Sequence, residues 1–213
     1  MRIDVFTLVP HAFAWLTEQQ PIAGVLGTEL ELRLINYRET TPLRAGQVDD
    51  EPYGGGAGMV LRVDVVAAAL EAVYAEERPG RVIALTPQGR PLTQQIVEEL
   101  AEQPHLTLLS SRFEGFDERI VEHLATDAIS VGPYVLSNGD LPAMILLDAV
   151  ARRLPGALAA GSGELESFSE ELGGGLEYPH YTRPAEFRGW KVPDVLLSGD
   201  HAKIEAWRRE RVR

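Results

Sequence analysis

Three loops rich in glycine, proline and small polar residues are the segments of this sequence best suited to chemistry. They cover residues 85–90, 110–119 and 130–142, and each directly follows a segment that we expect to be a strand. In an open sheet of parallel strands, ligands bind at the carboxyl ends of the strands, where such loops meet. The sequence therefore predicts one binding site shared by the three loops, although each loop alone is also compatible with a plain connection.

A fourth glycine-rich segment runs from Pro52 to Met59 and contains three adjacent glycines. Glycine permits positive φ and close backbone approach, which suits a loop lying against a flat or charged ligand. The segment is not a P-loop, because Ala57-Gly58-Met59 supplies neither the lysine nor the hydroxyl of that motif. It also lacks the strand-to-helix context of a dinucleotide fingerprint. A ligand-contacting loop and a plain surface loop both remain compatible with it.

Arginine and acidic side chains gather near the end of the last long apolar segment. Arg152 and Arg153 end that segment, and Glu166 lies in the Gly-, Ala-, Ser- and Glu-rich stretch that follows. Taken alone, an acid in such a stretch is more often a solvated surface residue. The run Asp49-Asp50-Glu51 is not assigned a metal, because three consecutive acids do not converge on one ion.

Alternating strands and helices must position these groups. Short links join them, which predicts an α/β fold built on a mainly parallel sheet. The expected strands are 2–7, 30–37, 81–85, 106–109 and 127–131, and the expected helices begin at Pro10 and cover 63–77, 91–102, 117–125 and 141–153. We divide the chain into an α/β domain at 1–154, a flexible linker at 155–175 and a small helical domain at 176–213 that closes with a helix at 201–212.

Composition and charge exclude several classes of protein. The 213 residues include no cysteine, which rules out disulfides, thiolate zinc sites and cysteine nucleophiles. No apolar stretch approaches the roughly 18 residues of a membrane span, and no signal-peptide core begins the chain, so we expect a cytoplasmic protein with no membrane partner. The net charge of −12 argues against wrapping nucleic acid by bulk electrostatics, but residues 178–213 carry +3 and could hold RNA locally.

At these segments the chain resembles the bacterial tRNA (guanine-N1-)-methyltransferases of the TrmD type, in the knotted SPOUT class. The resemblance is collinear over almost the whole chain, and its most specific part is Pro179-His180-Tyr181-Thr182-Arg183-Pro184. The other matching segments are 4–8, 53–59, 87–90, 112–119, 132–144 and 196–201.

The resemblance implies a fold, an activity and partners. It implies a parallel-sheet SPOUT domain with a deep trefoil knot and a small helical C-terminal domain that contacts tRNA, here shorter than usual. It implies a homodimer whose active sites are shared between protomers, and methylation of N1 of guanosine 37 in tRNA with S-adenosylmethionine as methyl donor. Magnesium is a possible cofactor to which no site is assigned.

The resemblance also implies roles for single residues. Glu166 falls at the position of the family's catalytic Asp and would be the general base, with Glu164 and Glu170 as reserve candidates, and Arg152 would stabilise guanine O6. The residues implied for methyl-donor binding are Ala84, Leu85, Thr86, Pro87, Ser111, Arg112, Glu114, Gly115, Val131, Gly132, Pro133, Tyr134, Val135, Leu136, Asn138, Gly139 and Pro142. Those implied for substrate binding are Asp50, Tyr53, Gly58, His180 and Arg183, although His180 and Arg183 are equally compatible with a turn that docks the C-terminal domain.

The sequence departs from the family pattern at several of these positions. Ser111 replaces a usual Gly, Pro133 replaces Asp, Phe113 replaces Tyr, and Asn138-Gly139-Asp140 replaces Gly-Gly-Glu. Pro133 has no amide hydrogen, so it cannot donate a backbone hydrogen bond to a ligand. The alternative function is therefore a non-catalytic RNA- or nucleotide-binding module that keeps the fold.

Overall fold

The computed structural model describes residues 1–77, 79–159 and 166–213. The chain forms two compact units, Met1–Leu158 and Ala159–Arg213. Among the described residues, no helix has the length and apolar character needed to cross a bilayer.

A five-stranded sheet forms the centre of the first unit. Its spatial order is β2-β1-β6-β5-β7, and every neighbouring pair is parallel. The strands are β1 (Arg2–Thr7), β2 (Glu31–Asn36), β5 (Arg81–Pro91), β6 (His105–Leu109) and β7 (Asp127–Ser130). The prediction of an α/β fold with a central parallel sheet is confirmed.

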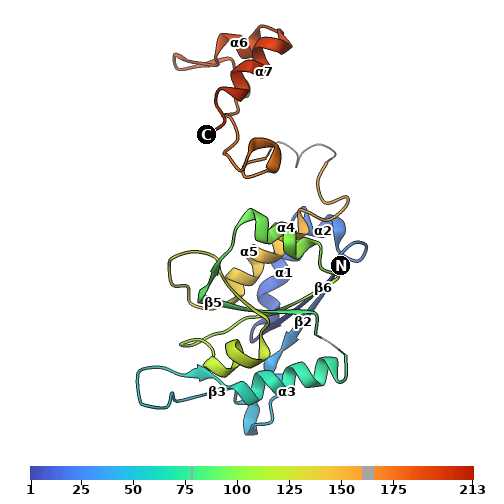
Figure 1. Ribbon diagram of the computed structural model, residues 1–213, viewed down its shortest axis with the longest axis vertical. Helices are drawn as coiled ribbons and strands as arrows, with labels where there is room; N and C mark the ends of the chain where they lie inside the picture. The colour runs from blue at the N-terminus through green and yellow to red at the C-terminus, as the bar shows by residue number, and fades with distance from the viewer. Residues whose placement is uncertain (78, 160–165) are drawn as a thin grey trace. The chain divides into compact units, whose positions relative to one another are not determined.

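Helices cover both faces of this sheet and bury two separate clusters of apolar side chains. Figure 1 shows α3 on one face and α1, α4 and α5 on the other. Because side chains alternate along a strand, Ile3 and Val5 of β1 belong to one cluster while Phe6 belongs to the cluster beneath α3. The helices are α1 (Ala14–Thr17), α2 (Ile22–Val25), α3 (Val63–Tyr74), α4 (Gln94–Ala101) and α5 (Asp140–Ala151), with 3-10 turns at Pro10–Phe13, Tyr37–Glu39 and Arg44–Gly46 and a π-helical turn at Ile120–Leu124.

Strand β5 is longer than the predicted 81–85. After an irregularity between Leu85 and Arg90, the chain pairs with β7 again, with Arg90 opposite Ile129. Gly89 makes this return possible, because a Cβ there would lie 2.4 Å from the backbone nitrogen of Ile129. The loop at 85–90 is thus held at both ends by β7.

Two other predicted elements also differ from the structure. The helix expected at 117–125 is present at 118–124, but from Ile120 to Leu124 it has π-helical hydrogen bonding. The helix expected at 63–77 ends at Tyr74, and Ala75 after it takes a positive φ of 50°. The polar stretch 38–58 contains β3 (Asp49–Asp50), which pairs antiparallel with β4 (Val60–Leu61).

The second unit contains two short helices and an antiparallel hairpin. These are α6 (Asp194–Leu197), α7 (His201–Arg209), β8 (Glu186–Phe187) and β9 (Trp190–Lys191), with a 3-10 turn at Glu170–Leu172. Leu176 and Arg213 exchange two backbone hydrogen bonds of 2.7 and 3.1 Å, which fastens the end of the chain to the start of the unit. The hairpin was not among the predicted elements.

Candidate functional site

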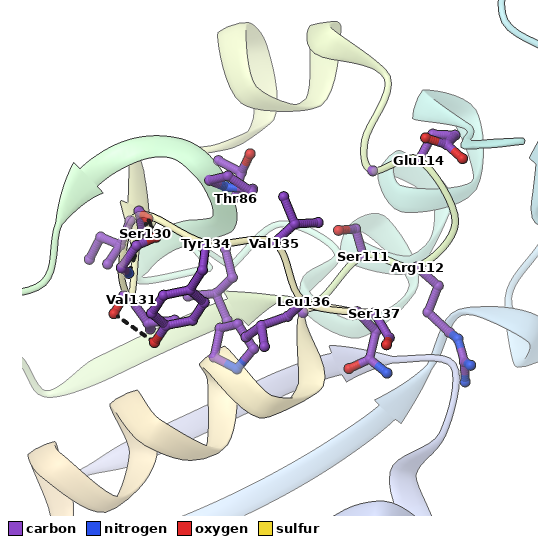
Figure 2. A pocket seen from close by; sticks show the side chains of 18 of the residues that line it. Thr86, Ser111, Arg112, Glu114, Ser130, Val131, Tyr134, Val135, Leu136 and Ser137 are labelled. Atoms are coloured by element: carbon purple, nitrogen blue, oxygen red, sulfur yellow. Dashed lines mark hydrogen bonds between the residues drawn. The ribbon is translucent and has the colours of Figure 1, made fainter. Parts of the chain in front are cut away.

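A cavity lies at the carboxyl ends of β5, β6 and β7, where the three predicted loops come together (Figure 2). Figure 2 shows Arg112 and Glu114 at one end of the cavity and Ser130 and Val131 at the other. The lining residues are Leu85, Thr86, Pro87, Ser111, Arg112, Phe113, Glu114, Gly115, Ile129, Ser130, Val131, Gly132, Tyr134, Val135, Leu136, Ser137, Asn138, Gly139 and Pro142. The loops therefore meet as the sequence predicted.

Most of the residues implied for donor binding line this cavity, and two do not. Ala84 is fully buried inside β5, and Pro133 is exposed to solvent on the loop that follows β7. Four further residues line the cavity and were not among those implied for donor binding: Phe113, Ile129, Ser130 and Ser137. Ile129 and Ser130 end β7, so their position at the carboxyl end of a strand was the signal that could have identified them.

The cavity combines apolar residues with polar side chains such as Thr86, Ser111 and Asn138. Leu85 and Ile129 are buried apolar residues at the strand ends, whereas Tyr134 and Val135 are exposed. The Tyr134 hydroxyl donates a hydrogen bond of 3.2 Å to the carbonyl oxygen of Val131, which folds the loop after β7 back on itself (Figure 2). Apolar surface with a few convergent polar groups is typical of small-molecule sites.

The glycine-rich segment 52–59 lies against one wall of the cavity. The backbone N–H of Glu114 donates to the carbonyl oxygen of Met59 at 2.9 Å. Gly58 has a φ of +80°, and a Cβ at this position would lie 2.4 Å from the Glu114 carboxylate. Only glycine fits here without displacing Glu114.

A second depression lies next to this cavity in the sequence, because Gly115 lines the cavity and the following residue, Phe116, lines the depression. Its lining includes Asp50 and Tyr53, two of the residues implied for substrate binding. Arg62 also lines this depression, and its guanidinium forms ion pairs with the carboxylates of Asp50 at 2.7 Å and Asp64 at 2.8 Å. The same guanidinium holds the pKa of Asp64 below its usual range.

The two residues implied for catalysis belong to different units of the chain. Arg152 caps the end of α5 in the first unit, whereas Glu166 lies in the second. The reserve candidate Glu164 lies outside the described residues.

His180 and Arg183 lie in an exposed segment of the second unit. His180 bonds the Glu177 carboxylate at 2.6 Å, and its ring lies 4.9 Å from that of Tyr178. The guanidinium of Arg208, on α7, lies 5.0 Å from the centre of the Tyr178 ring. The contact between Tyr178 and Arg208 holds the start of the segment Pro179–Pro184 beside the basic helix α7.

Within residues 1–77, 79–159 and 166–213, no three His, Asp or Glu side chains come together in a group that could hold a metal ion. The acidic run at 49–51 accordingly forms no such group, and Asp50 is paired with Arg62 instead.

The whole chain matches known proteins. A family model described as tRNA (Guanine-1)-methyltransferase TrmD matches residues 1–213. A protein of Brevibacillus brevis named tRNA (guanine-N(1)-)-methyltransferase is 51% identical over 210 residues, which cover 98% of this chain and 85% of that protein. A protein of the same name from Bacillus cereus strain AH820 is 48% identical over 213 residues, which cover 99% of this chain and 86% of that protein.

Proposed function

The chain belongs to the tRNA (guanine-1)-methyltransferase TrmD family, and we propose that it methylates N1 of a guanosine in tRNA, with S-adenosylmethionine as donor. We propose position 37, beside the anticodon, as the target. The observation that carries the proposal is the cavity at the carboxyl ends of β5, β6 and β7, in a chain that matches the family from end to end.

The cavity fits the chemical character of this donor. Leu85, Ile129 and Leu136 offer apolar contact to a flat base, and the Glu114 carboxylate at one end suits a positively charged group. When bound, the donor supplies a methyl group on a sulfonium sulfur, which keeps the bonding electron pair when the methyl leaves. The chain's main contribution to this displacement is to hold the reacting atoms in line.

Glu166 and Arg152 are the residues that we assign to proton transfer and charge stabilisation. Guanine N1 carries a hydrogen at neutral pH and becomes a nucleophile only when that proton is removed. In the proposal the Glu166 carboxylate accepts the proton, and the Arg152 guanidinium stabilises the negative charge that develops on O6. A glutamate in place of the family's aspartate adds one methylene of reach, about 1.5 Å.

The substrate guanosine would occupy the second depression and the glycine loop beside it. Asp50 and Tyr53 line that depression, and Gly58 of the glycine loop lies against the side chain of Glu114, which lines the donor cavity. His180 and Arg183 would contact the RNA from the second unit. An unpaired anticodon-loop base can be splayed out of its stack, as this arrangement requires.

The trefoil knot and the homodimer are further parts of the proposal. Gly139 on the last loop donates a 2.7 Å hydrogen bond to the carbonyl oxygen of Ser111 on the preceding one, so two of the loops that the knot would interlock are in contact. Leu141 and Ile145 lie one helical turn apart on α5 and are about half exposed, which supports a partner protomer on that face. A tRNA substrate also favours a cytoplasmic enzyme.

Transfer of a labelled methyl group tests the proposal. The protein is incubated with labelled S-adenosylmethionine and either tRNA carrying G37 or the same tRNA with adenosine at position 37. Label on the first tRNA alone is the expected result. Donor binding without transfer to either tRNA would contradict the proposal and support the non-catalytic module instead.

A further inference from the structure

A buried carboxylate lies just behind the donor cavity and does not line it. Asp140, the first residue of α5, is only 3% exposed. Its Oδ1 accepts hydrogen bonds from the Thr7 hydroxyl at 2.6 Å and the Ser110 hydroxyl at 2.7 Å. Thr7 ends β1 and Ser110 follows β6, and both are buried. One carboxylate oxygen thus fastens two neighbouring strand ends to the start of a helix.

The second oxygen of this carboxylate is buried with no hydrogen-bond partner among the described residues. The hydroxyl of Tyr37 is also buried and has no hydrogen-bond partner among the described residues. Burial and the charge of Asp140 raise the pKa of Tyr37, against the opposing effect of the nearby Ser110 N–H, so the phenol stays protonated. A buried carboxylate that is only half satisfied costs stability. Packing alone therefore gives no reason for a charge at this position.

Asp140 is joined directly to two walls of the cavity. Its backbone N–H donates to the Asn138 side chain at 3.0 Å, and the neighbouring Gly139 donates to the carbonyl oxygen of Ser111 at 2.7 Å. The two walls touch so closely that a Cβ on Gly139 would lie 2.8 Å from the Ser111 nitrogen. Any movement of Asp140 away from Ser110 would separate these walls.

We propose that Asp140 is a positioning residue for the methyl donor, because its bonds to the Thr7 and Ser110 hydroxyls hold the wall at 110–112 against the wall at 138–142. This role rests on the proposed function. It predicts that loss of the carboxylate weakens donor binding while leaving the residues assigned to proton transfer, and the contacts to tRNA, in place.

The test compares Asp140→Ala with Asp140→Asn. The alanine variant loses the acceptor of both hydroxyls, and we expect the KM for S-adenosylmethionine to rise about tenfold or more, a change of about 1.4 kcal/mol. We expect kcat and the KM for tRNA to stay within about twofold of the wild type. Asparagine keeps the Oδ1 acceptor in the same shape, so it should restore the donor KM to within about threefold.

Asp4→Asn is the matched control. Asp4 is a fully buried carboxylate on β1, the strand that ends at Thr7, and it contacts no residue of the cavity. This variant should lose stability without a change in donor KM when assayed where it is folded. If Asp140→Ala loses stability in the same way and keeps the wild-type donor KM, the positioning role is wrong.

A milder variant and a binding measurement cover the remaining cases. If Asp140→Ala does not fold, Ser110→Ala removes one of the two donors and should still raise the donor KM about threefold; an unchanged KM would overturn the role. The dissociation constant for the donor, measured by calorimetry without tRNA, should follow the same order. That constant tests Asp140 even if the wild type methylates no tRNA and the proposed function fails.

Discussion

Two buried carboxylates lie toward opposite ends of the central sheet, Asp4 toward the amino end and Asp140 at the carboxyl end, and they differ in their hydrogen-bond partners. Asp4 accepts hydrogen bonds from Arg2 at 2.7 Å, Tyr74 at 2.7 Å and His105 at 3.0 Å. Asp140 accepts only from two hydroxyls and keeps one oxygen without a partner among the described residues. The amino end of the sheet is therefore built for stability.

The carboxyl end gives up part of that stability. Its polar groups are spread over the loops after β5, β6 and β7, and their positions are fixed by backbone contacts such as the one between Gly139 and Ser111. Natural proteins commonly accept a local loss of stability where a ligand must bind. The difference teaches that burial of a charge does not by itself reveal its role; its partners do.

Glu166→Gln should have the largest effect on turnover of all the variants. It tests activity separately from the stability of the two ends of the sheet. The amide cannot accept the proton from guanine N1, so we expect kcat to fall by about 10²–10⁴. The donor dissociation constant and the midpoint of urea unfolding should stay unchanged. A variant with full turnover would remove Glu166 from the role of base and return attention to Glu164 and Glu170.

Asp4→Asn should be the most destabilising change at the amino end. The amide removes the charged partner of the Arg2 guanidinium, which is 25% exposed, and weakens the hydrogen bonds from Tyr74 and His105, so we expect the free energy of unfolding to fall by about 1.5–3 kcal/mol. Urea unfolding measures the loss. A loss below about 1 kcal/mol would show that the network around Asp4 contributes little and would undo the contrast with Asp140.

Acid should weaken the amino end through the same carboxylate. Burial opposes ionisation of Asp4, but the hydrogen bonds from Arg2, Tyr74 and His105 outweigh it, so the pKa of Asp4 is lowered in the folded protein. A lowered folded-state pKa means that the stabilisation is complete above the unfolded value near 3.8 and is lost as the pH falls through the folded value. Unfolding free energies measured between pH 6 and pH 2.5 should therefore fall less steeply with acid in Asp4→Asn than in the wild type.

Tyr37→Phe should have the smallest effect. The hydroxyl that is removed has no hydrogen-bond partner among the described residues, so its loss should change the unfolding free energy by less than about 1 kcal/mol, or raise it. The same urea titration measures this. A larger loss would mean that the hydroxyl donates to Asp140 in solution, and the carboxyl end would then resemble the amino end more closely.

Local patterns in the sequence predicted much of the fold and of the site. Strand β1 was predicted at its observed bounds because alternating apolar residues with period two mark a half-buried strand. The three loops were expected at one edge because parallel strands end together. The resemblance then named most of the residues that line the cavity, without any knowledge of their distances.

Other features depended on contacts between segments far apart in the chain. The return of β5 to β7 after Gly89 depends on space beside Ile129, and the place of Gly58 depends on the side chain of Glu114. Neither contact leaves a periodic signal in the sequence. The same holds for the hairpin of the second unit, whose two-residue strands are too short to show alternation.

The sequence by itself determined the order of strands and helices, the parallel sheet and the loops that carry the candidate site, because hydrophobic periodicity and turn residues are local properties. The tertiary structure decided which buried groups meet. In the sequence Asp140 lies just before the helix expected at 141–153, and only the fold brings the Thr7 and Ser110 hydroxyls to it across 133 and 30 residues of chain. Such partners are set by packing of distant segments, which no local pattern encodes.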